Sequence, residues 1–175
     1  CFWMRVFEIP EGSKLSKGRA IQNLINIESD DKVKAFICTQ DLKDENYINN
    51  HFVIMCTKKG QVKKTSLEQY SRPRSNGINA ITIKDEDELL EAKLTTGNSQ
   101  ILIAVKSGKC IRFEEGKTRP MGRNASGVRG VRLKDNNDEV VGMLSVNDMD
   151  SDILVVSENG YGKRSKLDDY RITNR

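Results

Sequence analysis

The sequence is poor in histidine, tryptophan and proline. It has one histidine, one tryptophan and three prolines among 175 residues. His51 has no serine or cysteine motif that would complete a catalytic triad, and the chain contains no glycine loop of the kind that cradles phosphate in nucleotide-binding enzymes. An enzymatic function is therefore the least favoured hypothesis, and no catalytic residue is predicted.

Short cysteine pairs are also missing. The four cysteines, Cys1, Cys38, Cys56 and Cys110, are separated by 37, 18 and 54 residues. Such spacings do not form the compact motifs that hold a metal ion or carry out redox chemistry. Apart from Cys1, the cysteines lie in apolar runs, where a thiol behaves as a small hydrophobic group. We expect reduced cysteines, as in a cytoplasmic protein, and no metal site.

Long apolar runs and aromatic clusters are absent as well. No run approaches the ~20 apolar residues that a membrane-spanning helix needs, and we expect no signal peptide. Aromatic residues make up 6% and are not interleaved with the basic segments, so stacking on single-stranded bases is poorly supported. We predict a cytoplasmic protein without membrane contact. Its first residues, 1–7, read as the middle of a strand, so we expect it to be part of a longer chain.

What the sequence does contain is an internal repeat of about 50 residues. Three apolar runs each end at a glycine, and these glycines, Gly60, Gly108 and Gly160, are 48 and 52 residues apart. Glycine is favoured there because hairpin turns require positive φ. The segment Lys64–Tyr70 recurs two units later as Arg164–Tyr170. The repeat therefore predicts a series of similar hairpins.

Two further landmarks follow each hairpin. A basic loop that contains Arg-Pro occupies residues 72–77 and 119–127, and the first unit has a looser counterpart at 17–19. An acidic turn then leads into another strand, and its copies are residues 28–31, 85–88 and 135–139. One unit reads as strand, glycine turn, basic strand, basic loop, strand, acidic turn, strand.

Four short strands in about 50 residues, without convincing helical periodicity, indicate propeller blades rather than βαβ units. We predict an all-β, propeller-like fold of about 3.5 four-stranded blades. The predicted units are approximately 1–50, 51–99, 100–151 and an incomplete 152–175.

Charge is segregated within these units. The net formal charge of +4 says little by itself. Segments 57–75 and 106–132 carry net charges of +5 and +6, whereas segment 84–91 carries −4. If blades stack around an axis, equivalent basic positions recur along one rim and form a band. Counterion release makes such a band a sequence-independent site for duplex DNA, while the acidic turns would lie on another face.

These segments resemble the C-terminal domain of DNA gyrase A, a part of the type IIA topoisomerases. The resemblance extends over nearly the whole chain. The segments that carry it are Val6–Gly12, Lys17–Leu24, Thr57–Thr65, Ser71–Ile78, Arg119–Arg123, Gly127–Gly130 and Glu158–Arg164.

The resemblance implies a β-pinwheel, a six-bladed relative of the propeller whose blades exchange strands and whose outer rim bends and wraps double-stranded DNA. In the family's whole enzyme, gyrase B and the rest of gyrase A couple this wrapping to ATP-dependent negative supercoiling. ATP and Mg²⁺ are used by those other parts, so this chain is expected to be non-catalytic and without a cofactor. The family's short Gln/Arg-Arg-Gly-Gly-Lys-Gly stretch, which anchors wrapping, is absent here, so the resemblance supports DNA binding more directly than wrapping.

Two alternatives stay open: the corresponding domain of topoisomerase IV, and a propeller whose basic rim binds acidic protein surfaces. For DNA binding, the candidate residues are the cations of the repeated basic strands and loops. They are Lys17, Arg19, Lys63, Lys64, Arg72, Arg74, Arg112, Arg119, Arg123, Arg129, Lys163, Arg164 and Arg171.

Overall fold

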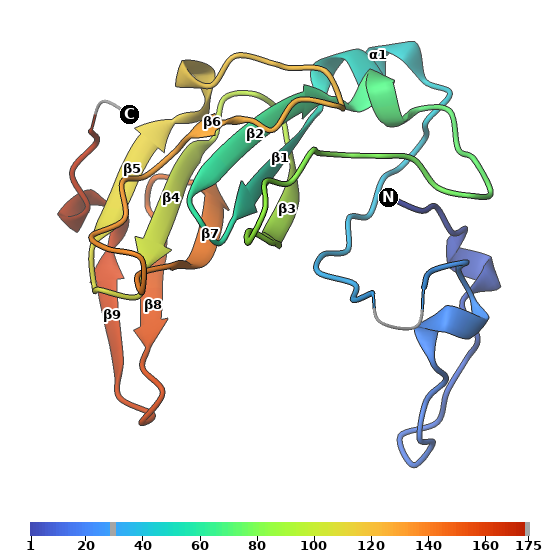
Figure 1. The fold of residues 1–175 in the computed structure, drawn as a ribbon, viewed down its shortest axis with the longest axis horizontal. Helices are drawn as coiled ribbons and strands as arrows, with labels where there is room; N and C mark the ends of the chain where they lie inside the picture. Colours follow the sequence, from blue (N-terminus) through green and yellow to red (C-terminus); the bar gives the residue numbers. More distant parts are fainter. Residues whose placement is uncertain (29–30, 174–175) are drawn as a thin grey trace.

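Antiparallel strands dominate the computed structural model, which describes residues 1–28 and 31–173. Ser29 and Asp30 of the first acidic turn, and Arg175, lie outside the described residues. The strands are β1 (Phe52–Thr57), β2 (Gln61–Ser66), β3 (Leu89–Thr95), β4 (Gln100–Val105), β5 (Cys110–Glu114), β6 (Val128–Arg129), β7 (Val140–Val146), β8 (Asp152–Val156) and β9 (Gly162–Lys166). They form three sheets, in the orders β3-β1-β2-β6, β5-β4-β7 and β8-β9. The all-β prediction is confirmed (Figure 1).

Three hairpins repeat along the chain, β1–β2, β4–β5 and β8–β9, and all are antiparallel. Their turn glycines, Gly60, Gly108 and Gly160, have φ of 83°, 84° and 80°, which confirms the predicted reason for glycine. A short 3-10 helix directly follows each hairpin. These helices are η3 (Leu67–Tyr70), η4 (Glu115–Lys117) and η5 (Leu167–Asp169).

Neighbouring units exchange backbone pairings. β6 belongs to the third unit but pairs with β2 of the second, where Val62 lies opposite Val128. In the same way, Ile78 exchanges hydrogen bonds of 2.8 and 2.9 Å with Cys1 of the first unit. The predicted third strand of each unit is therefore short or irregular: residues 78–83 form no strand, and only Val128–Arg129 do so in the third unit. Each such segment pairs with the preceding unit instead of extending its own sheet.

The β1–β2 hairpin is buried on both faces, which explains why β1 reads as a continuous apolar run. Ile54 and Cys56 of β1 pack against Ile101 and Ile103 of β4. On the opposite face of β1, Val53 and neighbouring residues pack against side chains of the first unit. The core thus lies between successive sheets, as expected for blades packed face to face.

The first unit departs from the prediction. Residues 1–7 were expected to belong to a strand. They and residues 21–27, which follow the basic segment 17–19, are irregular except for two 3-10 helices, η1 (Val6–Glu8) and η2 (Ile21–Asn23). A strand needs a ladder partner, and Ile78 is the one residue with which Cys1 exchanges backbone hydrogen bonds in the described part of the chain. The unit also contains α1 (Glu45–Asn50), which was not predicted. Its N-cap is Asp44, whose side chain accepts bonds from two helical N–H groups.

Candidate nucleic-acid interface

The strands give the molecule two chemically different ends. At the hairpin end, the glycine turns of the second and third units are each held by the acidic turn of the same unit. The N–H of Lys59 donates to Asp87 over 2.9 Å, and the N–H of Ser107 donates to Asp138 over 2.9 Å. At the opposite, loop end lie η3, η4 and η5, which lead into the basic loops (Figure 1). The acidic turns and the basic loops are therefore separated by the length of the strands.

Charge at the hairpin end is balanced by ion pairs within and between units. Glu88 pairs with Lys34 at 2.6 Å and also with Lys58. Glu139 lies 3.8 Å from Lys58 and 3.7 Å from Lys106. Hydrogen bonds from Lys34 and then Lys58 lower the pKa of Glu88 to about 2. These lysines are consequently occupied by carboxylates and contribute little free positive charge.

The basic strand residue four positions after the glycine is buried in two of the three hairpins. Lys64 lies 3.1 Å from Glu115, whose side chain is fully buried, and its ammonium group sits 4.2 Å from the centre of the Phe52 ring. Glu115 also accepts bonds from Thr95 and Ser99. The pair joins the second unit to the third.

Arg112 repeats this arrangement one unit later. Its guanidinium group donates to the carbonyl oxygens of Leu167 and Tyr170 at 2.8 and 3.1 Å, and Asp168 lies 3.7 Å away. Lys63 is also fully buried and donates to the carbonyl oxygens of Ala80 and Arg123.

The expectation that Lys63, Lys64 and Arg112 lie on the surface is therefore wrong. Their long side chains reach across the interface between units and bind groups of the neighbouring unit, because the second hairpin strand lies against the next unit rather than against solvent. None of the three is available to contact a DNA backbone directly. Much of the positive charge counted along the sequence is thus internal.

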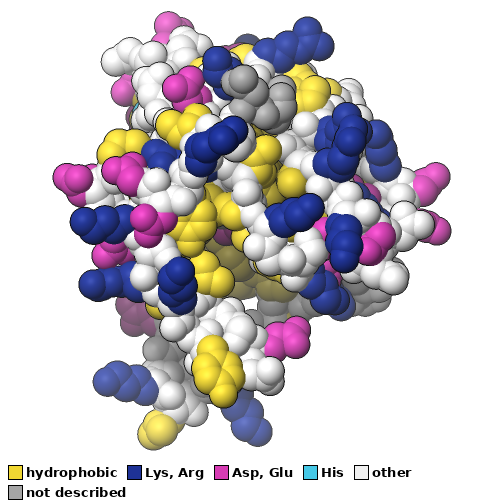
Figure 2. Space-filling view, turned by 90° about the vertical axis from the view of Figure 1, so that its left-hand side faces the viewer, with side chains coloured by type: hydrophobic (Ala, Val, Ile, Leu, Met, Phe, Trp, Pro, Cys, Tyr) yellow, Lys and Arg dark blue, Asp and Glu magenta, His cyan; other side chains and the backbone are white. Residues whose placement is uncertain are grey.

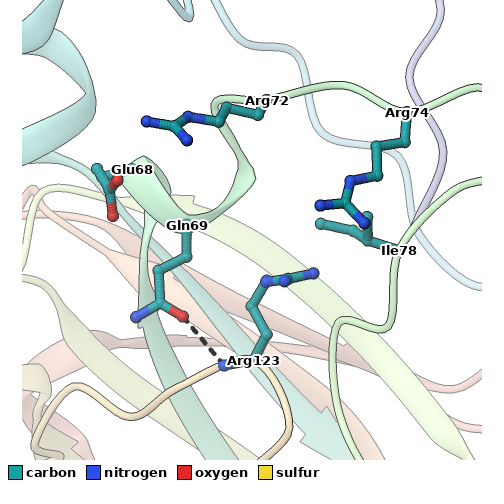
Figure 3. A pocket seen from close by; sticks show the side chains of 6 residues that line it. All are labelled: Glu68, Gln69, Arg72, Arg74, Ile78 and Arg123. Carbon is teal, nitrogen blue, oxygen red and sulfur yellow. Dashed lines mark hydrogen bonds between the residues drawn. The ribbon is translucent and has the colours of Figure 1, made fainter.

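Three arginines that remain accessible gather at the loop end. Arg72 and Arg74 extend from the loop after η3, and Arg123 comes from the facing loop of the third unit (Figure 3). With Glu68, Gln69 and Ile78 they line a cavity of about 340 Å³, which we call the arginine cleft. The sequence did not predict Glu68, Gln69 and Ile78 as site residues, because the prediction considered only cations.

Arg123 is held in place through its backbone. Its N–H donates to the side-chain oxygen of Gln69 over 3.1 Å, and its guanidinium group donates to the carbonyl oxygen of Asn79 at 3.4 Å. Arg123 is half-buried, whereas Arg72 and Arg74 are exposed. Two successive units therefore contribute to one cleft, with three guanidinium groups and one carboxylate, that of Glu68, along its walls.

The other candidates are exposed but do not line the cleft. Arg164 pairs with Asp152 at 3.2 Å. Arg119 and Arg171 follow η4 and η5, as Arg72 follows η3, so these three occupy repeated positions at the loop end. Contact with DNA stays a prediction for all of these exposed residues, which are Lys17, Arg19, Arg119, Arg129, Lys163, Arg164 and Arg171.

One side of the molecule has a different character. Leu154, Val155 and Val156 of β8 are 66%, 52% and 60% exposed. Figure 2 views the molecule from the side on which β9 lies. Hydrophobic side chains gather in the middle of this face, and Lys and Arg side chains lie around them. This face is partly apolar, so positive charge does not cover the described surface evenly.

Three further properties of the described residues concern metal binding, cysteine pairing and membrane contact. Within 1–28 and 31–173, no cluster of three or more His, Cys, Asp or Glu side chains could bind a metal ion, and all four cysteines are free. No helix in those ranges is both long enough and apolar enough to span a membrane.

Stacked hairpins, pairing between units and face-to-face packing define a bladed β-repeat protein of the propeller type, here with an arginine cleft between two units. A family model described as "DNA gyrase C-terminal domain, beta-propeller" matches residues 1–40, 51–96, 100–147 and 151–175. The chain therefore belongs to the family of DNA gyrase C-terminal domains.

Curated relatives agree with this assignment. The chain is 42% identical over 173 residues to DNA gyrase A of Staphylococcus epidermidis, and 41% identical over 174 residues to that of Staphylococcus aureus. Each match includes 98% of this chain but 19% of the relative's length.

Solved structures support the fold. The C-terminal domain of DNA topoisomerase IV superimposes with a TM-score of 0.80 at 28% identity, over 90% of this chain and 47% of that one. The DNA gyrase A C-terminal domain superimposes with a TM-score of 0.76, over 91% of this chain and 51% of that one. The identity in the second case is 24%, so that likeness concerns the fold alone.

Proposed function

We propose that this chain is a non-catalytic module that binds and bends double-stranded DNA. In the whole enzyme it would support the ATP-dependent negative supercoiling carried out by gyrase A together with gyrase B in the cytoplasm. Family membership supports the class of function. The observation that carries the proposal is the arginine cleft, where Arg72, Arg74 and Arg123 converge at the end of the molecule away from the acidic turns.

The chemistry of the cleft suits a phosphate backbone. Guanidinium groups present several N–H donors in a plane and bind phosphate oxygens in a bidentate way. The cleft offers no aromatic surface for base stacking among the residues that line it. We therefore expect contacts with the duplex backbone and little readout of base sequence.

A mobility-shift titration over a salt series tests this function. If roughly six to ten phosphates are contacted, the logarithm of affinity should fall against the logarithm of salt concentration with a slope of about −5 to −9. Replacing Arg119 and Arg123 with Ala should weaken binding to all duplex sequences to a similar extent and make this slope shallower. A flat salt response would instead favour a protein partner, and an effect confined to one DNA sequence would indicate base readout.

A second candidate is the corresponding domain of topoisomerase IV, which the TM-score of 0.80 to that domain favours. The two functions differ at the level of the whole enzyme. Complete enzymes that contain this domain should be assayed on relaxed plasmid and on interlinked DNA rings, with and without the domain. Loss of negative supercoiling on deletion supports gyrase, whereas loss of decatenation alone supports topoisomerase IV.

A further inference from the structure

Lys63 is a buried cation that no carboxylate balances. The two other buried basic side chains described above each have an acidic group nearby, Lys64 at 3.1 Å from Glu115 and Arg112 at 3.7 Å from Asp168. Lys63 is fully buried and forms no ion pair with any residue in the described part of the chain. Burying a charge without a partner is costly. We therefore expect the buried ammonium group of Lys63 to have a function that involves the groups around it.

The Lys63 ammonium group adjoins the backbone of Arg123, one of the residues that line the arginine cleft. The ammonium group donates to the carbonyl oxygen of Ala80 at 2.6 Å and to that of Arg123. Ala80 belongs to the second unit and Arg123 to the third, so Lys63 joins the two units that form the cleft. Because Gln69 accepts from the N–H of Arg123, the backbone of this arginine is held on both sides.

Positive charge accumulates at this point. Burial, and secondarily the charge of Arg123, lower the pKa of Lys63 to about 8. Tyr70 is a further titratable group beside it. The Tyr70 hydroxyl also donates to the Ala80 carbonyl oxygen, at 3.2 Å, and burial raises the pKa of Tyr70. Glu68 lines the outer cleft. An anion bound among the guanidinium groups would reduce this repulsion and favour protonated Lys63.

We propose that Lys63 is the positioning residue of the arginine cleft, and that its protonated form holds Arg123 so that one phosphate group of duplex DNA binds across the junction of two units. This inference rests on the proposed DNA-binding function. It adds that DNA binding is linked to protonation of a residue that does not touch the DNA. When Lys63 loses its proton, it loses positive charge and the strength of its bonds to the two carbonyl oxygens.

The test is fluorescence anisotropy with a labelled DNA duplex between pH 7 and 9, at constant salt, with wild type, Lys63→Met and Lys63→Arg. For wild type we expect Kd to rise roughly 3- to 10-fold over this range, since one pKa unit of differential interaction corresponds to tenfold. Lys63→Met should bind at pH 7 as weakly as wild type does at pH 9, and without pH dependence. Lys63→Arg, which stays charged, should keep its pH 7 affinity at pH 9.

A matched control is available in the third unit. Ile111 follows Gly108 by three residues, as Lys63 follows Gly60, so Ile111→Met changes the equivalent position without changing charge. It should leave both the affinity and its pH dependence as in wild type. If Lys63→Met retains the pH dependence of wild type, the proposal is wrong.

Calorimetry of wild type covers the case in which the variants fail to fold. Titration of the duplex into the protein at pH 8, in buffers of different ionisation enthalpy, should reveal net proton uptake, and zero uptake overturns the proposal. The outcome also separates this inference from the function on which it rests. Failure of wild type to bind duplex at any pH removes the proposed function, whereas binding without proton uptake removes only the role of Lys63.

Discussion

One repeated position is buried in two units and exposed in the third. The residue four places after each turn glycine is a cation, Lys64, Arg112 or Arg164. The first two are buried against the next unit, whereas the side chain of Arg164 is 76% exposed. The sequence predicts that this position is basic but not where it points, because alternation along a strand does not show which face another unit covers. The partners of the two buried cations are distant in sequence: Glu115 is 51 positions from Lys64, and Leu167 is 55 positions from Arg112.

The buried pair of Lys64 and Glu115 leads to a stability prediction. Lys64→Ala leaves the carboxylate of Glu115 buried without its cation, and we expect a loss of about 3–5 kcal/mol in the free energy of unfolding. Lys64→Met combined with Glu115→Gln should recover most of this loss, because no charge is then left buried and the amide oxygen can still accept from Thr95 or Ser99. Urea unfolding measures both. Arg164→Ala, at the equivalent exposed position, is the control and should cost less than about 1 kcal/mol; a similar cost for all three would contradict the pairing.

The lowered pKa of Lys63 predicts how the free energy of unfolding changes with pH. Its pKa is about 8 in the folded chain, against an ordinary value of 10.5. Between these values the unfolded state binds more protons than the folded state, so the free energy of unfolding should increase as pH rises from 8 toward 10. Below pH 8 both states are protonated and this contribution levels off.

Urea unfolding at intervals from pH 7 to 10 measures this effect, and the difference between wild type and Lys63→Met isolates it from other titrating groups. The difference should change through the pH 8–10 range. Stability and DNA affinity should then move in opposite directions with pH. Parallel curves for the two proteins would show that Lys63 does not titrate in this range.

At the scale of elements, pairing between units depends on glycines placed where two backbones approach. Gly127 has φ of 89°, and a Cβ there would lie 2.6 Å from the carbonyl oxygen of Val62. Gly127→Ala should therefore cost roughly 2–4 kcal/mol, since backbone strain and overpacking each cost about 1–3 kcal/mol. Gly108→Ala has similar φ but open space around it, so about 1–2 kcal/mol is expected. Thermal unfolding checks both, and equal losses would mean that the close approach to Val62 is unimportant.

The same pairing limits what the sequence predicts about elements. Hairpins are local, so the turns at Gly60, Gly108 and Gly160 are predicted correctly from sequence patterns. The third strand of a unit is not local, because its hydrogen-bond partner is in the preceding unit, as in the pairing of Val128 with Val62. In the third unit, only Val128–Arg129 form a regular strand, although apolar and polar residues continue to alternate as far as Leu133. α1 escapes prediction because six residues are too few for helical periodicity to show.

At the scale of the whole molecule, the distribution of compensated charge matters more than the net charge. Lys34, Lys58 and Lys106 lie at the hairpin end, each within 4 Å of a carboxylate. Arg72 and Arg74, at the loop end, form no ion pair within the residues that the structure describes. A counterion atmosphere that can be released upon DNA binding should therefore surround the loop end more than the hairpin end.

Two double variants with the same change in net charge test this asymmetry. Arg72→Ala with Arg74→Ala removes two cations from the arginine cleft, whereas Lys58→Ala with Lys59→Ala removes two from the hairpin end. The first should weaken duplex binding on the order of tenfold or more and reduce the slope against salt by about 2, since each lost phosphate contact lowers it by about 1. The second should change the slope little, because Lys58 already neutralises Glu88 and Glu139. Mobility-shift titrations at four or more salt concentrations measure both slopes. If the two variants lose equal affinity and equal slope, then DNA responds to the total charge of the chain rather than to the cleft.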